Sequence, residues 1–330
     1  MNPARSCTLF VSSAYGRDEC SSQPAGRINP TPTRNNIMKQ RRKEIDFIAY
    51  LFIRLATFPP RWVYQILTWP IIRLGSSGLI SGRIPVFRRV LNNISIVFPE
   101  MDGTQKRILL RRAIRKVVVG YYESSCIYRW NWVSRAVTAE GLNHLNEALS
   151  KGKGVVMFSA HLGTFPLILS YLKLRGYPIR NIGRDPENPS LARYFEKVRK
   201  KAGITHIPKN PVGVSIRESM RWLASGKILS LPSDQHTGQG IRVPFFGRSV
   251  RTATGPAVFA RRLGCAVLPV SIVRRGKKHL IRIEPELKMN RSEDQKKDIR
   301  ENTALCNRVI ERWVREDPAE WFGWFTRRFR

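Results

Sequence analysis

The chain is poor in cysteine, and no spacing would let its few cysteines act together. Its 330 residues contain five cysteines, an odd number. They lie far apart without any Cys-x-x-Cys pair, which argues against a zinc ribbon and against a disulfide-stabilised secreted scaffold. A reducing compartment fits this usage best. The five are Cys7, Cys20, Cys126, Cys265 and Cys306.

Acidic residues are also scarce. The chain has 24 Asp and Glu residues against 58 Lys and Arg residues, which gives a formal net charge of +34. Such a charge favours a polyanionic partner, either a nucleic acid or an anionic membrane surface. Because the basic residues are spread along the chain and no known nucleic-acid module is present, we expect a membrane surface and no nucleic acid.

The sequence has no apolar run long enough to span a membrane, which takes about 20 consecutive residues. Residues 45–80 are largely apolar, but arginines and prolines divide them. Trp62 and Trp69 stand among arginines, a pattern typical of side chains at a lipid headgroup boundary. We therefore expect amphipathic, membrane-associated helices over residues 38–80, with a buried helical hairpin as the alternative.

Residues 1–37 differ in composition from the rest of the chain. Ser, Pro, Asn, Gly and Arg dominate them, and they lack the continuous apolar core of a signal peptide. They are either a disordered leader or a mis-assigned start, with translation beginning at Met38, which we favour. The expected organisation is thus a leader at 1–37, a membrane-associated segment at 38–80 and one domain at 81–330.

Strand-like and helix-like segments alternate through this domain. Short buried apolar runs predict strands at 154–159, 227–231, 266–273 and 279–284. Helical periodicity predicts helices at 104–125, 191–201, 212–224, 257–263 and about 293–316, and Thr164 is expected to cap a helix ending near Gly176. This alternation predicts an α/β fold, a mixed and largely parallel sheet flanked by helices.

Polar residues follow two of the predicted strands. His161 comes just after the strand at 154–159, where an imidazole can take a proton from a hydroxyl near neutral pH. Asp234 and Gln235 come just after the strand at 227–231. Taken alone, each has an ordinary structural explanation, but functional groups in an open α/β sheet gather where strands end, so one crevice can collect them.

Two further loops have the same character. Arg184 follows another strand-like segment, and guanidinium matches phosphate well. The segment from Thr252 to Ala257 opens a predicted helix, whose free backbone N–H groups can receive an anion.

At these residues the sequence resembles the late acyltransferases of lipid A biosynthesis, the lauroyl/myristoyl type. The resemblance runs from about Ile45 to Arg330. The blocks that carry it are Asn92-Asn93-Ile94, Val97-Phe98-Pro99-Glu100, Ser159-Ala160-His161-Leu162-Gly163, Arg184 with Asn188-Pro189, Asp234-Gln235, Pro244-Phe245-Phe246-Gly247 with Thr252 and Gly255, and the tail from Asp317 to Arg330.

The resemblance implies an acyltransferase-like α/β fold and a reaction at the cytoplasmic face of the bacterial inner membrane. Such enzymes take an acyl chain from acyl carrier protein and esterify a hydroxyl of an anionic lipid A precursor, without a metal or bound cofactor. It implies His161 as general base, with Asp234 as a candidate partner. The residues expected to bind substrate are Gly163, Arg184, Gln235, Thr252 and Gly255.

One departure from the family pattern bears on the chemistry. The motif is His-x-x-x-x-Asp/Glu, and here the acidic position is Pro166, while Thr326 stands where a His is usual. Three outcomes follow: a weak enzyme with His161 alone, a substitute carboxylate such as Asp234, or a non-catalytic lipid-binding relative. The acceptor also stays open, since a lysophospholipid or another glycolipid would suit the same chemistry.

Overall fold

The computed structural model describes residues 63, 66, 68–70, 72, 73, 84–185 and 188–330. All of them fall in one compact unit, Lys43–Arg330. The leader at 1–37 lies outside the described residues, and so does most of the membrane-associated segment expected at 38–80. Of the few residues described there, Ile66 and Trp69 are exposed. Within the described residues, no helix is both long and apolar enough to cross a bilayer.

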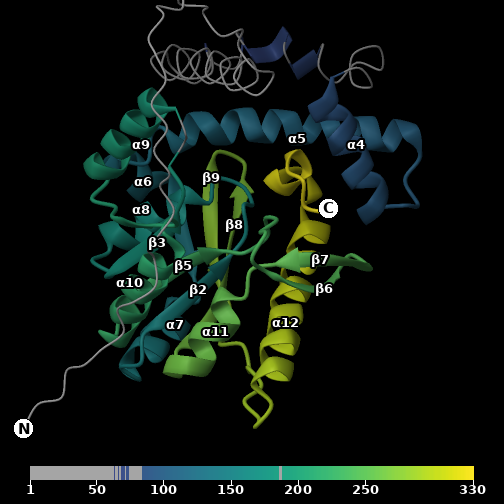
Figure 1. Cartoon of the computed structure of the whole chain (residues 1–330). Helices are drawn as coiled ribbons and strands as arrows, with labels where there is room; N and C mark the ends of the chain where they lie inside the picture. Colours follow the sequence, from purple (N-terminus) through teal and green to yellow (C-terminus); the bar gives the residue numbers. More distant parts are fainter. Residues whose placement is uncertain (1–62, 64–65, 67, 71, 74–83, 186–187) are drawn as a thin grey trace, which may run out of the picture. The chain divides into compact units, whose positions relative to one another are not determined.

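A seven-stranded sheet forms the centre of the described part of the chain, in the order β1-β9-β8-β2-β5-β3-β4 (Figure 1). Neighbours pair in parallel except β8 and β9, which are antiparallel. The mixed, largely parallel sheet expected from the sequence is confirmed. The strands are β1 (Val137–Glu140), β2 (Val155–Ser159), β3 (Ile179–Gly183), β4 (His206–Pro208), β5 (Ile228–Pro232), β8 (Ala266–Arg275) and β9 (Lys278–Ile283).

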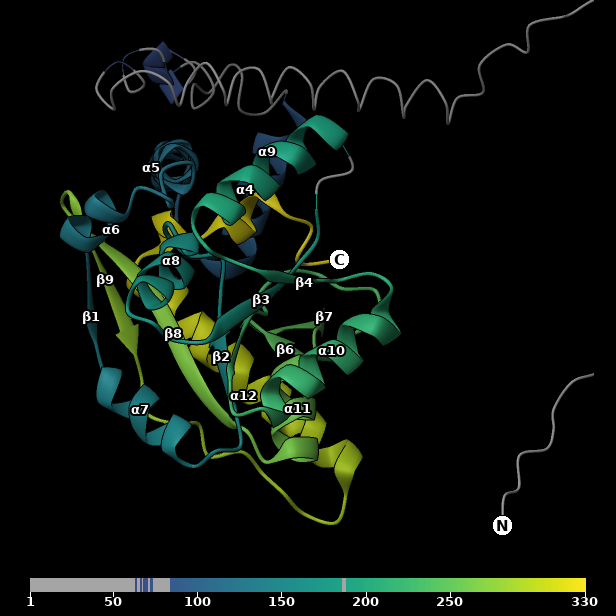
Figure 2. The same ribbon diagram turned by 90° about the vertical axis from the view of Figure 1, so that its left-hand side faces the viewer.

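Helices cover both faces of this sheet, because its central strands are apolar on both sides. Along β2, Val155 and Met157 join one buried cluster, whereas Val156 and Phe158 join the other. The first cluster receives α6 (Trp130–Ala136), α7 (Leu142–Ser150), α8 (Pro166–Leu174) and α9 (Pro189–Lys201). The second receives α10 (Val212–Ala224), α11 (Gly255–Leu263) and α12 (Gln295–Glu316), and Figure 2 shows α7 and α11 on opposite sides of β2.

The predicted helices and strands of this domain are confirmed, with small shifts at their starts. The helices expected from Leu191 and Ala257 each begin two residues earlier, at Pro189 and Gly255. In both, a proline sits in the first turn, where its fixed φ and missing N–H are tolerated.

A two-stranded hairpin was not expected. The segment between Gln235 and Thr252, where no strand was expected, contains β6 (Ile241–Phe245), which pairs antiparallel with β7 (Arg248–Thr252). The turn between them is Phe246 and Gly247, with φ of 47° and 71°. Positive φ at both positions suits a tight hairpin turn, and the proline and glycines of the segment hid the strand pattern.

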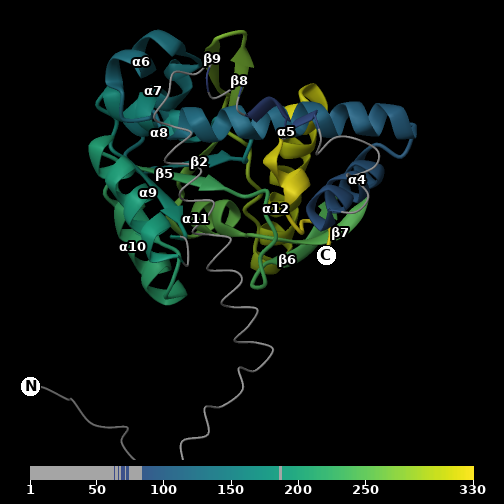
Figure 3. The same ribbon diagram turned by 90° about the horizontal axis from the view of Figure 1, so that it is seen from above.

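Two helices and the C-terminal tail close the carboxyl end of the parallel strands. Helix α4 (Pro85–Val97) packs on α5 (Gly103–Ser124), which runs across the sheet at this end (Figure 3). Asp102 starts α5 with a reciprocal capping box that includes Gln105. The tail forms two short 3-10 turns, η1 (Pro318–Glu320) against α5 and η2 (Phe322–Phe325) against α4.

Asn93 of α4 is the side chain that ties this tail down. It is buried, and its Nδ2 donates to the carbonyl oxygens of Trp324 at 2.9 Å and Thr326 at 3.1 Å. Replacing Asn93 with Ala leaves two carbonyls without this donor. We expect the free energy of unfolding to fall by about 1–3 kcal/mol, measured by urea denaturation. Asn92→Ala, at the exposed neighbouring position, is the control.

Candidate active site

His161 and Asp234 meet because their strands are neighbours. Strand β2 ends at Ser159 and β5 ends at Pro232, and the two pair in parallel register. The backbone N–H of Ser233 continues this pairing by donating to Ser159 O at 2.9 Å. The residues that follow each strand therefore emerge at the same edge of the sheet, as expected for an open α/β fold.

The two side chains form a short contact. His161 Nδ1 lies 2.6 Å from Asp234 Oδ1, and the backbone N–H of His161 donates to the same oxygen at 3.1 Å. Asp234 is fully buried, whereas the His161 side chain keeps 20% of its surface exposed. With Nδ1 carrying the proton toward the carboxylate, Nε2 is left as the acceptor for a substrate proton.

Asp234 is held in its charged form. Burial on its own would raise the pKa of this carboxyl, but the charge of His161 and the hydrogen bonds from His161 and Trp321 outweigh burial and lower it. Trp321 Nε1 supplies one of these bonds, to Asp234 Oδ2 at 2.9 Å. The pair thus has the arrangement of a general base with an orienting carboxylate.

A cavity of about 320 Å³ opens at His161. Most of its wall is apolar, and Gly163, Pro166 and Gln235 also line it. Such a space beside a base suits a hydrocarbon chain attached to a reacting carbonyl. The remaining lining residues are Lys116, Val117, Gly120, Tyr121, Ser124, Phe165, Phe195, Glu320 and Phe322.

Comparison with known proteins identifies the family of the chain. The family of bacterial lipid A biosynthesis acyltransferases matches residues 36–330. The chain belongs to this family. Its members are enzymes, so the chain is an acyltransferase, and the resemblance expected from the sequence is confirmed.

Curated relatives are distant but extensive. The lipid A biosynthesis palmitoleoyltransferase of Escherichia coli (strain K12) is 23% identical over 281 residues, which cover 82% of this chain and 88% of the relative. The lipid A biosynthesis lauroyltransferase of the same organism is 22% identical over the same shares. A phosphatidylinositol mannoside acyltransferase of Mycolicibacterium smegmatis is 26% identical over 188 residues, which cover 54% of this chain and 58% of that relative.

The other site residues expected in this acyltransferase are dispersed. Arg184 is exposed beyond β3, outside the cavity, and its charge adds to burial in lowering the pKa of Lys209. Gly255 lines a second cavity of about 360 Å³, which shares no lining residue with the first. Thr252 is buried and accepts hydrogen bonds from Asn307 and Arg328. Of the residues expected to bind substrate, only Gly163 and Gln235 line the cavity beside the His161–Asp234 pair.

A buried ion cluster beneath the cavity was missed from the sequence. Glu123 of α5 pairs with Arg274 of β8, and its Oε2 accepts from Thr164 Oγ1 at 2.7 Å. Thr164 therefore does not cap α8 as expected, since its hydroxyl is used by Glu123 and Pro166 starts the helix without a side-chain cap. Arg274 also pairs with Glu320, which Lys116 contacts from the cavity wall.

The tail residues of the site were also missed, although the tail block belonged to the family resemblance. Backbone N–H of Gly163 donates to Glu320 O at 3.0 Å, and that of Phe322 donates to His161 O at 2.9 Å. The tail thus pairs with the loop that carries His161. The density of aromatic residues after Pro318 indicated that the tail is buried. The tail has no periodicity, however, that would predict which loop these residues contact.

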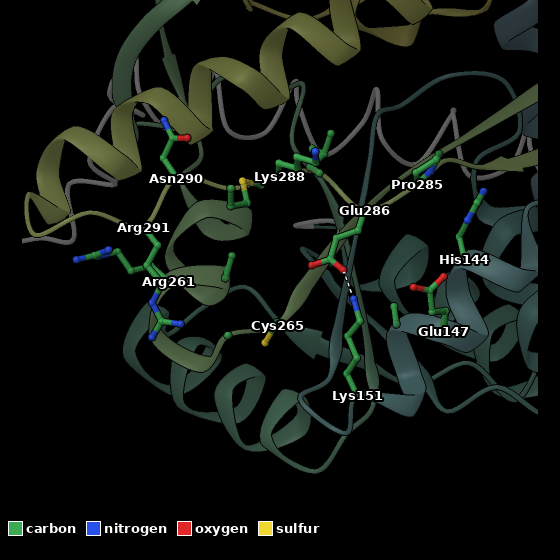
Figure 4. Close-up of a pocket in the computed structure, with 15 residues that line it drawn as sticks. His144, Glu147, Lys151, Arg261, Cys265, Pro285, Glu286, Lys288, Asn290 and Arg291 are labelled. Carbon is green, nitrogen blue, oxygen red and sulfur yellow. Dashed lines mark hydrogen bonds and ion pairs between the residues drawn. The ribbon is translucent and has the colours of Figure 1, made fainter.

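The most voluminous of the described cavities, about 560 Å³, is far from this chemistry. It lies where β2 and β8 begin, at the opposite edge of the sheet, between α7, α11 and the segment after β9. Figure 4 shows its charged rim, with Lys151 and Glu286 paired at 2.7 Å. Among the described residues, no cluster of three or more His, Cys, Asp or Glu side chains is placed to hold a metal.

The buried carboxyl of Glu123 makes the stability of the protein depend on pH. Burial would raise its pKa, but His279 and Arg274 lower it from 4.5 to about 2. Its contribution to stability, about 3 kcal/mol, is therefore complete above pH 4.5 and is lost as pH falls toward 2. We expect Glu123→Gln to be less stable at neutral pH and to lose less stability over this range, measured by urea denaturation at stepped pH. Glu100→Gln, at an exposed position, controls for the loss of one charge.

Proposed function

We propose that this acyltransferase moves a fatty acyl chain from acyl carrier protein to a hydroxyl of a lipid A precursor, with His161 as general base and Asp234 as its partner. The observation that carries the proposal is the His161–Asp234 pair, joined at 2.6 Å, at the mouth of a largely apolar cavity. The family to which the chain belongs supports the reaction class.

The chemistry requires one proton to be moved. Nε2 of His161 takes the proton of the acceptor hydroxyl while the oxygen attacks the thioester carbonyl carbon. The carbon–sulfur bond then breaks, and the departing thiolate takes the proton back from the imidazolium. Asp234 stays ionised throughout, holding the ring and stabilising the imidazolium. The products are an ester and the free thiol of the carrier.

The proline at position 166 is compatible with this mechanism. Pro166 starts α8 and lines the cavity, while the carboxylate that contacts His161 comes from the segment after the neighbouring strand β5. A carboxylate at position 166 is therefore not needed to hold Nδ1. This argues for an active enzyme over a lipid-binding relative without catalysis.

Basic residues near the pair favour anionic substrates. The pKa of His236 is lowered by burial and then by the charges of Arg328, Arg330, Arg251 and Arg242. His236 lies two residues from Asp234 in the sequence, so the charge of these nearby arginines would attract a phosphorylated acceptor or the acidic carrier protein. Arg184 remains a proposed phosphate ligand from outside the cavity.

An anionic membrane is the proposed working surface, on the cytoplasmic face of the bacterial inner membrane. The exposed side chains of α5 include Arg107, Arg112 and Arg115 together with Ile108 and Tyr121, which are 54% and 44% exposed. Apolar side chains among cations are typical of an interfacial helix. Tyr121 also lines the cavity, so a lipid substrate would enter from this side.

A different glycolipid acceptor is the second candidate. The relative named as a phosphatidylinositol mannoside acyltransferase supports it, since that protein shares 26% identity over 54% of this chain. Parallel assays with a lipid A precursor and a mannosylated phosphoinositide, both with the same acyl donor, separate the two acceptors.

Asp234→Asn tests the catalytic pair. It keeps the volume and removes the charge that stabilises the imidazolium, so kcat should fall by roughly 10²- to 10⁴-fold, as should that of His161→Ala. Pro166→Glu should change kcat little, because Nδ1 already has its partner. Asp185→Asn, at an exposed carboxylate paired with Arg199, is the control. A near wild-type kcat of His161→Ala would exclude His161 as the general base. A large increase in kcat of Pro166→Glu would exclude Asp234 as the partner of His161.

Replacing Gly120 with a larger residue tests whether the cavity holds the acyl chain. Gly120 lies inside α5 and lines the cavity, and a Cβ there would meet nothing closer than Thr164 Oγ1 at 3.8 Å. Gly120→Leu should fill part of the cavity and lower kcat/KM for hexadecanoyl relative to decanoyl carrier protein by roughly tenfold or more. Gly103→Leu, at the exposed start of the same helix, should leave the ratio unchanged. An unaltered ratio in Gly120→Leu would place the chain elsewhere.

A further inference from the structure

The indole of Trp321 connects the C-terminal tail to the catalytic pair. Its Nε1 donates to Asp234 Oδ2 at 2.9 Å, while Oδ1 receives both contacts from His161. The two carboxylate oxygens therefore have separate donors, one from the tail and one from the loop after β2. Trp321 is fully buried, so water does not compete for this bond.

Backbone pairing and ring contacts together fix the position of the indole. The backbone of Trp321 forms an antiparallel bridge with Leu162, flanked by the bonds from Phe322 to His161 and from Gly163 to Glu320. Its ring packs on Trp324 with centroids 4.7 Å apart, and on Phe245 at 5.9 Å. The indole N–H is thus a rigid donor whose place is tied to the same loop that carries His161.

A rigid donor at Oδ2 constrains Asp234 in a way that burial alone does not. The last torsion of an aspartate side chain is soft, so a carboxylate held only by His161 can rotate and offer either oxygen. Rotation would move the acceptor of Nδ1 and hence tilt the imidazole. General-base catalysis is sensitive to this, because Nε2 has to lie within hydrogen-bond reach of the acceptor hydroxyl.

We propose that Trp321 is a positioning residue for acyl transfer: its indole N–H holds Oδ2 of Asp234, so that Oδ1 alone orients His161. The inference rests on the proposed function of the pair and adds to it a role for the C-terminal tail. The tail is thereby part of the active site, although it lies about 90 residues after Asp234 in the chain.

Trp321→Phe removes the donor and keeps most of the ring. We expect kcat to fall by roughly tenfold or more, the effect of losing one hydrogen bond to a charged group, with KM for donor and acceptor nearly unchanged. The carboxylate, deprived of one donor, becomes more basic and binds the imidazolium more strongly. The acidic limb of the pH–kcat profile should therefore move to higher pH.

Trp324→Phe is the matched control. Trp324 is also fully buried and its Nε1 also makes one hydrogen bond, but to the carbonyl oxygen of Pro318 at 2.6 Å. Both variants are expected to lose stability, measured as the midpoint of thermal unfolding. Only Trp321→Phe should change kcat and the pH profile. If Trp321→Phe and Trp324→Phe changed kcat and the pH profile equally, the proposal would be overturned, because the cause would then be loosened packing of the tail.

A second replacement guards against misfolding of Trp321→Phe. Benzothienylalanine at position 321 has a sulfur in place of the indole N–H and nearly the same shape. It should reproduce the fall in kcat and the pH shift while the packing of the ring is kept, so that stability falls only by the lost hydrogen bond. A wild-type profile would exclude the positioning role. If His161→Ala stays active, the proposed function itself fails. If His161→Ala is inactive but the benzothienylalanine variant keeps the wild-type pH–kcat profile, only the role of Trp321 is rejected.

Discussion

The structure around the site depends on the burial of one charge, the carboxylate of Asp234. A buried carboxylate is strongly unfavourable unless donors surround it. Here the donors come from two separate places in the chain, His161 after β2 and Trp321 in the tail. Satisfying this one group therefore brings the ends of β2 and β5 and the C-terminal segment together, and any change that frees either donor disturbs all three.

The tail in turn needs its own anchors, and these come from the start of the described domain. Asn93 of α4 binds two tail carbonyls, and Lys116 of α5 pairs with Glu320. Glu320 is also reached by Arg274, which joins it to Glu123 under the cavity floor. The helices that precede the sheet and the segment that follows it thus hold one another, with the loop that carries His161 between them.

Sequence patterns predicted the sheet, the helices that flank it and the nearness of His161 and Asp234, because these follow from local periodicity and from where parallel strands end. They missed β6, whose proline and flanking glycines imitate a loop, and they gave Thr164 a capping role although Glu123 takes its hydroxyl. Thr252 looked available for substrate but is bound by Arg328 and Asn307. The contact between Thr164 and Glu123 joins residues distant in sequence, which spacing along one segment does not encode, whereas the β6–β7 hairpin is local and was hidden by its composition.

Charge is distributed unevenly between surface and interior. The chain is short of acidic residues, with 24 against 58 basic ones, yet Glu123, Asp234, Asp298 and Glu320 are all buried in the described part. Each is paired with a cation or a histidine: Arg274, His161, Arg261 and Lys116 respectively. The interior therefore uses acids to fix cationic side chains in place, while most other basic residues stay outside. A surface of this kind would favour the anionic partners proposed above, while the carboxylate of Asp234 stays fully buried beneath it.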